Sequence, residues 1–219
     1  MDGFITYLSF TRDHLLEKTA EHATVVGVSV FLATLIGLTV GCLTYQRRRG
    51  PNYANISLAI AGTMLTIPSY ALFGILLPFL GLGWGPSIVA LTAYGVLPVL
   101  RNTITGLRGV DPAVTDSAQG MGLSRRQRLF RIELPLAAPV ILAGIRVSTL
   151  ILLGIAAIAA AVAGPGLGED IFSGLARIGS ATALYLVLGG VLGIVLLAIA
   201  FDVAFFVVRK LAIPKGIRN

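Results

Sequence analysis

The chain has 219 residues, of which 56% are hydrophobic and 12% charged, and its mean hydropathy is +0.88. Globular domains average roughly 45–50% apolar and about 25% charged residues, so this composition excludes a water-soluble fold. It also excludes intrinsic disorder, which requires low hydrophobicity. The net charge of +7 comes from basic residues whose positions fit a membrane topology, so no nucleic-acid partner is expected.

The first 22 residues predict a short amphipathic helix that lies at the extracytoplasmic surface or against the helix bundle. Phe4, Leu8 and Leu15 recur at helical spacing among charged residues. His14 and His22 are expected to be solvated, because neither a Cys nor a third His accompanies them to form a metal site. The segment lacks a basic region followed by a continuous apolar one, so a cleaved signal peptide is not expected.

Five later stretches are long and apolar enough to cross a membrane. A helix needs about 20 apolar residues to span a hydrocarbon layer of about 30 Å. The stretches are residues 23–45, 56–80, 86–106, 140–163 and 181–208. Pro68, Pro78 and Pro98 break helical hydrogen bonds, so kinks are expected there. We therefore predict an all-α membrane protein with five transmembrane helices in a transmembrane domain over residues 23–208.

The basic residues indicate how these helices are oriented. With the N-terminus outside, Arg12, Lys18 and Arg177 face the exterior, and every other Lys and Arg falls on the opposite side or at its boundary. Because Lys and Arg accumulate in cytoplasmic loops, the basic side is the cytoplasm. Five crossings then place the C-terminus inside, with residues 209–219 as a cytoplasmic tail. This orientation suits a bacterial cytoplasmic membrane, whose inner lipid surface is anionic.

The predicted spans lack the ionisable residues that gradient-driven transporters bury at mid-membrane. Arg101, Arg146 and Asp202 lie toward the cytoplasmic ends, where snorkelling or an Arg–Asp pair is favoured over a substrate-handling role. No Lys follows a Gly to form a phosphate-binding loop, and the single Cys42 supports no catalytic or metal centre. We therefore expect no enzyme activity, metal or cofactor in this chain, and an energy source in another subunit.

The loop over residues 107–137 predicts a compact helical hairpin between the third and fourth spans. Asp111 is placed to cap a first helix that begins with Pro112, and Gly122 is placed to end it in the left-handed conformation. Ser124 is placed to cap a second short helix carrying a row of arginines, which Pro135 ends or redirects into the membrane. Such a hairpin exposes small side chains on one helix and basic ones on the next.

This loop resembles the EAA loop of binding-protein-dependent ABC importer permeases. The family pattern is Glu-Ala-Ala, three residues, Gly, nine residues, Ile, one residue and Leu-Pro. The positions that match it are Asp116, Ser117, Ala118, Gly122, Ile132, Leu134 and Pro135. Asp116 stands in place of Glu and Ser117 in place of Ala, and both changes are conservative. An ordinary amphipathic cytoplasmic loop is the alternative interpretation.

In that family, the EAA loop is the coupling helix that docks in a groove of the cytoplasmic ATPase subunit. The resemblance therefore implies that residues 111–124 transmit ATP-driven closure to the spans. The implied coupling residues are Asp111, Ala113, Asp116, Ser117, Ala118, Gly120, Gly122, Ile132, Leu134 and Pro135. It also implies a type I importer fold, two ABC ATPase subunits, a second permease subunit, identical or related, and a separate extracytoplasmic substrate-binding protein.

Three longer stretches are similar to one branch of these permeases. They are TIPSYALFGILLPFLGLG, VALTAYGVLPVLRNTITGLRGVDPA and GPGLGEDIFSGL. The branch imports osmoprotectants such as glycine betaine, carnitine, choline and proline betaine. Two alternatives remain: a permease of the same fold for an amino acid such as methionine, and a membrane scaffold or channel without ATP coupling. Co-purification of a P-loop ATPase distinguishes the last of these.

Aromatic residues are the candidates for the substrate pathway, because aromatic faces hold a trimethylammonium group best. Those candidates are Tyr70, Trp84, Tyr94 and Tyr185, although Trp and Tyr at span ends are also typical interfacial anchors. The outer loop over residues 164–180 carries Glu169, Asp170 and Arg177 on a glycine-rich frame. It is interpreted as a binding-protein contact or an outer gate, with a solvated turn as the alternative.

Overall fold

The structure is a computed structural model that describes residues 2–45, 52–180 and 182–212, and within those ranges every regular element is a helix. In chain order they are α1 (Asp2–Phe10), α2 (Arg12–Thr44), α3 (Tyr53–Thr66), α4 (Ser69–Leu80), α5 (Trp84–Gly109), α6 (Pro112–Gly120), α7 (Arg125–Arg128), the π-helix η1 (Leu129–Glu133), α8 (Leu134–Ala156), the 3-10 helix η2 (Ala157–Val162), α9 (Gly168–Ala176) and α10 (Ala183–Ala212). The predicted all-α class is confirmed.

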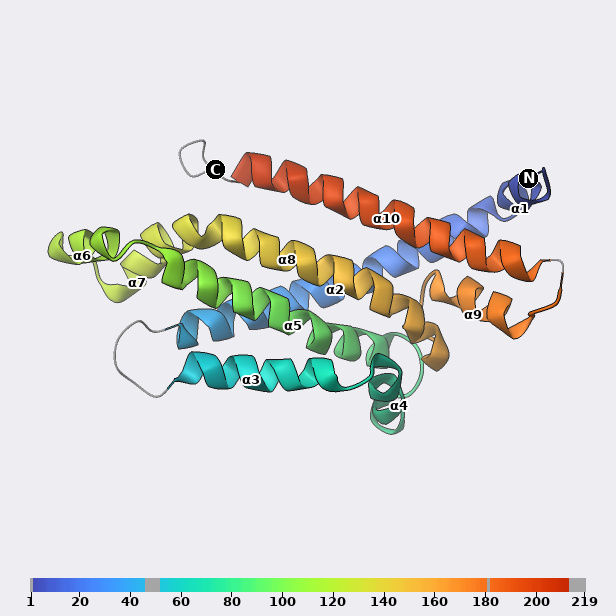
Figure 1. The fold of residues 1–219 in the computed structure, drawn as a ribbon, viewed down its shortest axis with the longest axis horizontal. Coiled ribbons are helices and arrows are strands. Elements are labelled where there is room, and N and C mark those ends of the chain that lie inside the picture. The colour runs from blue at the N-terminus through green and yellow to red at the C-terminus, as the bar shows by residue number, and fades with distance from the viewer. Residues whose placement is uncertain (1, 46–51, 181, 213–219) are drawn as a thin grey trace.

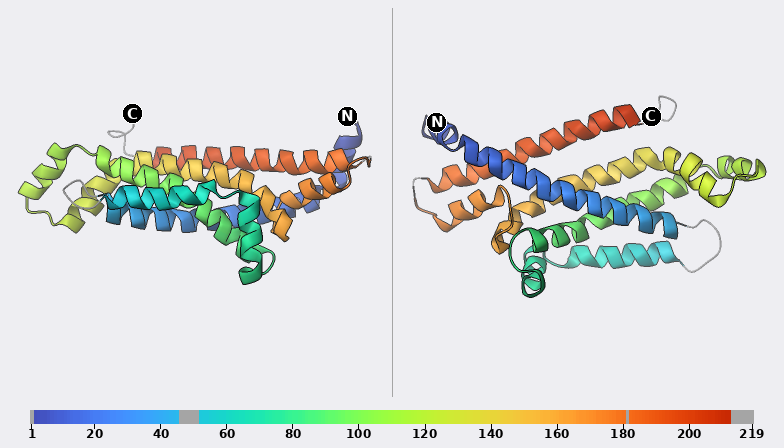
Figure 2. Two further views of the ribbon diagram at one scale, coloured as in Figure 1. Left: turned by 60° about the horizontal axis from the view of Figure 1, so that its bottom comes forward. Right: turned by 180° about the vertical axis from the view of Figure 1, so that it is seen from behind.

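The long helices lie side by side along the long axis of the molecule (Figures 1 and 2). Among the described residues, four segments are each long and apolar enough to cross a membrane: Arg12–Thr44, Trp84–Gly109, Arg125–Val162 and Ala183–Leu211. The pair α3 and α4 makes a fifth candidate if it is counted as one span. These segments cover the five predicted stretches. The helix at the fourth stretch begins earlier than predicted, because α7, η1 and α8 follow one another without a break.

The predicted second span, residues 56–80, is not one straight helix. The axes of α3 and α4 differ by 94°, and α4 projects sideways from the bundle (Figure 2, left). Pro68 has no N–H to donate to Met64, and Ile67 before it is extended at ψ 125°, as a residue preceding proline prefers. The expected kink at Pro68 is therefore a full change of direction. Pro78 and Pro98 lie inside α4 and α5, which continue through them.

The N-terminal segment also differs from the prediction. Helix α2 runs without interruption from Arg12 to Thr44, so residues 12–22 belong to the helix of the first span rather than to a separate surface helix. Helix α1 is a short element at that end, and it packs against α2 and α10. Continuity of α2 places His14 and Lys18 against Asp170 and Glu169 of α9.

Helix α5 is the centre of the bundle and packs against both α2 and α8. Its close contacts use small residues: a Cβ added at Gly95 would lie 2.9 Å from Ala33 Cβ and 2.9 Å from Ser148 Oγ. Likewise, a Cβ at Gly144 of α8 would lie 2.8 Å from the Pro98 carbonyl oxygen. Small residues let membrane helices approach at backbone distance, where dispersion and hydrogen bonds hold them. This packing brings the backbones of α5 and α8 close together.

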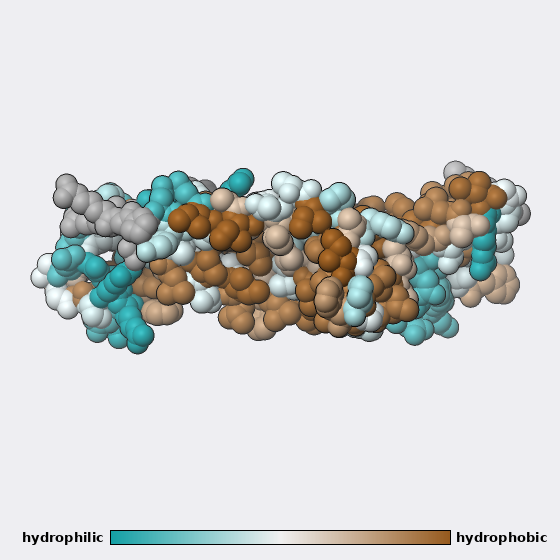
Figure 3. All heavy atoms as spheres, turned by 90° about the horizontal axis from the view of Figure 1, so that it is seen from below, coloured by the Kyte–Doolittle hydropathy of each residue, from teal (hydrophilic) through white to brown (hydrophobic). Residues whose placement is uncertain are grey.

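Helix α10 is the least enclosed long helix, since none of its most apolar 18-residue window is buried within the chain. It contacts α9, α8 and α2 along one side. Seen from below, the middle of the molecule is mainly apolar, and polar residues gather toward its two ends (Figure 3). An apolar surface of this kind is solvated by lipid or covered by another membrane subunit.

Candidate functional site

The hairpin formed by α6 and α7 begins with the predicted cap. Asp111 Oδ1 accepts a hydrogen bond of 2.8 Å from the Ala113 N–H, and Pro112 occupies the first turn of α6. This geometry satisfies one of the N–H groups that a helix start leaves unpaired, and proline at that position loses no helical bond. The predicted roles of Asp111 and Pro112 as helix-start residues are confirmed.

Helix α6 ends in a turn in which Gly122 has left-handed backbone angles. Gly122 has φ +81°, its N–H donates to the Gln119 carbonyl, and the Leu123 N–H donates to the Ala118 carbonyl. These two bonds together form a Schellman motif, which satisfies the last carbonyls of the helix. A Cβ at Gly122 would meet no atom within 4 Å, so glycine is required there for its backbone conformation and not for space.

The second helix of the hairpin is also locally fixed. The Ser124 side chain accepts from the Gln127 N–H, and the Gln127 side chain accepts from the Ser124 N–H at 2.8 Å, which is a full capping box. Arg128 donates to Gln119 Oε1 and so ties α7 to α6. Of the two expectations for Pro135, an end of the helix is wrong: the π-helix η1 bonds Leu134 N–H to Leu129 O, and the chain continues as a helix through Pro135 into α8, a candidate span.

Helix α6 presents the candidate coupling residues at the far end of the molecule, beyond the ends of the long helices (Figure 1). Asp111, Ala113, Asp116, Ser117, Gly120 and Gly122 are exposed. Ala118 is buried against its own hairpin. Ile132 and Leu134 are half-buried and Pro135 is exposed, and all three lie on η1 and α8 rather than on α6. The candidate positions on α6 are thus mostly accessible, whereas the Ile–Leu–Pro positions lie where the hairpin joins α8.

A buried polar contact missed by the sequence reasoning anchors the hairpin to the bundle. The Tyr45 hydroxyl donates to Glu133 Oε2 at 2.5 Å, and Glu133 is 7% exposed. Arg108 Nε donates to the Tyr45 carbonyl at 3.3 Å. Tyr45 therefore joins the end of α2 to both chain segments that enter and leave the hairpin. The positions are far apart in the sequence, so no spacing pattern could have indicated the contact.

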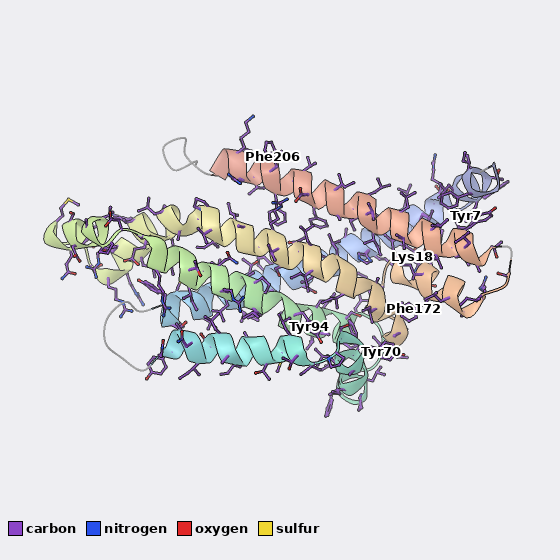
Figure 4. The ribbon with its side chains drawn as sticks, viewed as in Figure 1. Tyr7, Lys18, Tyr70, Tyr94, Phe172 and Phe206 are labelled. Atoms are coloured by element: carbon purple, nitrogen blue, oxygen red, sulfur yellow. The ribbon has the colours of Figure 1, made fainter. Side chains whose placement is uncertain are left out.

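The four aromatic candidates for the substrate pathway do not converge. Tyr94 is buried, and its hydroxyl donates to the Ile67 carbonyl at 2.7 Å, which satisfies a group freed at the break between α3 and α4. Tyr70 and Trp84 are exposed on α4 and at the start of α5. Figure 4 shows Tyr70 and Tyr94 near the base of α4. Tyr185 lies elsewhere, 6.0 Å from Tyr7 between ring centroids, in an aromatic cluster with α1.

The outer-loop candidates make contacts within the chain. Asp170 is 4% exposed, and its Oδ1 lies 2.9 Å from His14 Nε2. Glu169 pairs with Lys18 at 2.8 Å, while Arg177 is exposed at the end of α9. Lys18 is one of the side chains labelled in Figure 4. Asp170 therefore holds α9 on α2, and Glu169 and Arg177 remain available at the surface.

The expectation of solvated side chains holds for His14, which is exposed although it contacts Asp170, and is wrong for His22. His14 contacts Asp170, and His22 is fully buried with Nε2 3.1 Å from the Leu153 carbonyl oxygen. Gly166, with φ +108°, packs on His22, since a Cβ there would lie 2.8 Å from the imidazole. Within the described part of the chain, no group of three or more His, Cys, Asp or Glu side chains is placed to hold a metal ion. The histidines are structural contacts.

The expected Arg–Asp pair is confirmed. Arg146 Nε on α8 donates to Asp202 Oδ1 on α10. Both side chains keep access to the surface, at 52% and 42% exposure. An ion pair on a membrane helix faces protein or water rather than lipid. The pair therefore joins α8 to α10 at a partly exposed position.

A helical bundle of this kind, with a locally capped hairpin presented beyond its end, defines a multi-pass membrane protein of the transport-permease class. The chain belongs to the family described as binding-protein-dependent transport system inner membrane component, which matches residues 33–214. It is thus an inner membrane component of a transport system, and it has the fold of type I ABC importer permeases.

Relatives and a solved structure support this assignment along the whole chain. The choline transport system permease protein OpuBB of Bacillus subtilis is 38% identical over 100% of this chain and 98% of its own. The osmoprotectant import permease protein OsmW of Salmonella typhimurium is 35% identical over 98% of this chain and 99% of its own. The inward-facing MetNI methionine ABC transporter gives a TM-score of 0.78 over 90% of this chain and 95% of its own, with 24% identity.

Proposed function

We propose that the chain is the permease subunit of an ATP-driven importer that carries osmoprotectants such as choline, glycine betaine, carnitine or proline betaine into the cell. The observation that carries the proposal is full-length similarity, at 35–38% identity, to permeases named for choline, for glycine betaine, carnitine and choline, and for osmoprotectant import. The likeness to the methionine transporter, at 24% identity, concerns the fold alone, so it does not favour methionine as the substrate.

The hairpin is proposed as the element that couples the spans to ATP hydrolysis in a separate subunit. Its support is geometric, because α6 is exposed and its caps make it rigid. It also connects α5 directly to α8, the two helices of the bundle centre. Docking of α6 in an ATPase would therefore move these helices when two ATPases close. The ATPase subunits hydrolyse ATP, and this chain forms the membrane pathway that opens and closes in response.

The hairpin end is proposed to face the cytoplasm, with the N-terminus outside. Arg12, Lys18 and Arg177 lie at the end of the bundle opposite α6. The arginines of α7 and the basic last turn of α10 lie toward the hairpin end. This distribution follows the positive-inside rule. The basic triplet Arg47, Arg48 and Arg49 and the tail over residues 213–219 fall outside the described residues.

A second permease subunit is proposed to cover the open side of the bundle. The exposed apolar surface of α10 and the partly exposed Arg146–Asp202 pair support this proposal, because a neighbouring subunit would cover the first and shield the second from lipid. A substrate-binding protein is proposed to dock at the opposite end, where Glu169 and Arg177 are available. Tyr70 and Trp84 stay candidates for the substrate pathway, whereas Tyr94 and Tyr185 have packing roles within the chain.

Reconstitution tests the substrate class. The permease, its ATPases and its binding protein are placed in proteoliposomes, and ATP hydrolysis is measured with the binding protein loaded in turn with choline, glycine betaine, carnitine and methionine. The proposal predicts stimulation by a quaternary ammonium compound and matching uptake of the labelled compound. Stimulation by methionine alone would favour the amino-acid permease, and uptake without any ATPase would exclude the coupled mechanism.

A further inference from the structure

An apolar groove of about 810 Å³ lies between the end of α2 and the junction of α7 with α8. Leu38 and Leu43 form its α2 wall, and Leu129, Phe130 and Leu134 form the opposite wall. Leu43 and Phe130 are 68% and 66% exposed, so the groove opens to the outside of the chain. None of these residues is part of the exposed face of α6, and the proposed transport mechanism gives the groove no role.

Two arginines also line this apolar groove. Arg125 and Arg126 line it and are exposed, and within the described ranges neither guanidinium is in an ion pair. The neighbouring Arg128 differs, because it donates to Gln119 inside the hairpin. Guanidinium groups bind phosphate oxygens in a planar, often bidentate geometry. The groove therefore combines an apolar channel with two anion-binding side chains.

The position of the groove fits the edge of a lipid layer. Leu38 and Leu43 lie on the last turns of α2, a candidate membrane span, while Arg125 and Arg126 begin the helix that leads back into the bundle. Acyl chains that enter along α2 would reach the arginines with their headgroup. Basic residues next to a membrane helix attract anionic lipid, each strengthening binding by about fivefold.

We propose that this groove binds a phospholipid with an anionic headgroup, with its acyl chains against Leu38, Leu43 and Phe130 and its phosphate at Arg125 and Arg126. A second copy of the chain is a poorer occupant, because a symmetric contact there would bring two arginine pairs together. That the lipid belongs to the inner leaflet rests on the proposed orientation. The binding itself does not depend on the proposed function.

The test uses the single cysteine of the chain, Cys42, which lines the same groove. The full-length permease is purified into phosphatidylcholine nanodiscs with increasing phosphatidylglycerol, and the rate of Cys42 alkylation by a maleimide is measured. Native mass spectrometry of the same protein counts retained phosphatidylglycerol. The variant Arg125→Gln with Arg126→Gln removes the proposed headgroup site. The matched control, Arg101→Gln with Arg131→Gln, removes two exposed charges outside the groove.

Phosphatidylglycerol is expected to slow Cys42 alkylation relative to phosphatidylcholine alone. The Arg125/Arg126 variant should need about twenty- to thirtyfold more phosphatidylglycerol for the same protection, and the control variant should behave as the wild type. If Cys42 reacts too slowly without anionic lipid, Leu43→Cys with Cys42→Ala reports on the same groove from a more exposed position.

Three results would overturn the proposal. Equal protection by the two lipids would show that the groove has no preference for an anionic headgroup. Equal loss in the Arg125/Arg126 variant and its control would reduce the effect to overall charge. Protection that follows protein concentration rather than lipid would assign the groove to a second copy. Transport is not measured in any of these assays, so their failure leaves the proposed importer function standing, and failure of that function leaves lipid binding standing.

Discussion

The two ends of the bundle are held together in different ways. At the hairpin end, the bonds of Asp111, Gly122 and Ser124 join residues a few positions apart in the sequence. At the opposite end, His14 reaches Asp170 and the Glu21 carboxylate accepts from the Gly166 N–H at 3.2 Å, which joins the start of α2 to the α9 region. Local caps set the shape of the hairpin itself and the long-range Tyr45–Glu133 bond anchors its base, whereas long-range polar contacts join the segments of the opposite end.

The two kinds of contact suit the two ends to different proposed roles. In the proposed coupling mechanism, a hairpin fixed by its own caps would keep its shape when a partner moves it, and the motion of α6 would pass to α5 and α8. The opposite end depends on the relative position of α2 and α9, so its surface changes when those helices shift. The first arrangement suits a lever, and the second suits a gate that responds to the state of the bundle.

The largest effect is expected from Gly122→Val in the hairpin. Valine at φ +81° is strained by at least about 1–2 kcal/mol, and the alternative is to unwind the Schellman turn. We expect substrate uptake to fall to background while membrane insertion is unchanged, as measured by transport in proteoliposomes and by the amount of protein in the membrane.

The matched control is Gly179→Val at the opposite end. Gly179 also has positive φ, +96°, and a Cβ there would also meet no atom within 4 Å. The backbone strain is therefore comparable, but the residue lies far from the hairpin. Retained uptake in Gly122→Val, or equal loss in the two variants, would contradict a special role for the hairpin turn.

A middle-sized effect is expected from Tyr45→Phe, which removes the donor to the buried Glu133 carboxyl group. Leaving a buried acceptor without its partner costs about 1–3 kcal/mol. We expect a lower apparent melting temperature of the purified permease in detergent. Tyr53→Phe is the control, because Tyr53 is 53% exposed. A Tyr45→Phe protein that melts with the wild type would show that this anchor contributes nothing measurable.

The smallest effect is expected from Glu169→Gln at the opposite end. The Lys18–Glu169 pair is partly exposed, and Lys18 keeps Glu21 as a partner at 3.1 Å. Exposed ion pairs contribute about 0–1 kcal/mol, so the melting temperature should change little. A fall in melting temperature as large as that of Tyr45→Phe would mean that the Lys18–Glu169 pair stabilises its end of the bundle as much as the Tyr45–Glu133 bond stabilises the hairpin end.

The features that the sequence predicted are those set by neighbouring residues. The caps at Asp111 and Ser124 and the turn at Gly122 depend on side chains and backbone within a few positions, so residue type and spacing specify them. The apolar stretches are likewise local, because length and composition decide whether a helix can span a membrane.

The features that the sequence did not predict depend on distant partners. The burial of His22 requires the Leu153 carbonyl, and the Tyr45–Glu133 contact joins two ends of different spans. The break at Pro68 was visible as a kink, but its angle of 94° is fixed by tertiary packing and by the Tyr94 bond to Ile67. A proline indicates where a helix is interrupted, but packing against neighbouring segments sets the direction of the chain that follows.

The central claim is that the hairpin faces the cytoplasm and is held by an ATPase. Ala113→Cys and, at the opposite end, Ile178→Cys are each made with Cys42→Ala and treated with a membrane-impermeant maleimide in vesicles of known orientation. Both positions are exposed in the chain. The account predicts that Ala113→Cys reacts in inside-out vesicles alone and is protected when the ATPase is bound, while Ile178→Cys reacts in right-side-out vesicles. Labelling of Ala113→Cys from the outside, or no protection by the ATPase, would contradict it.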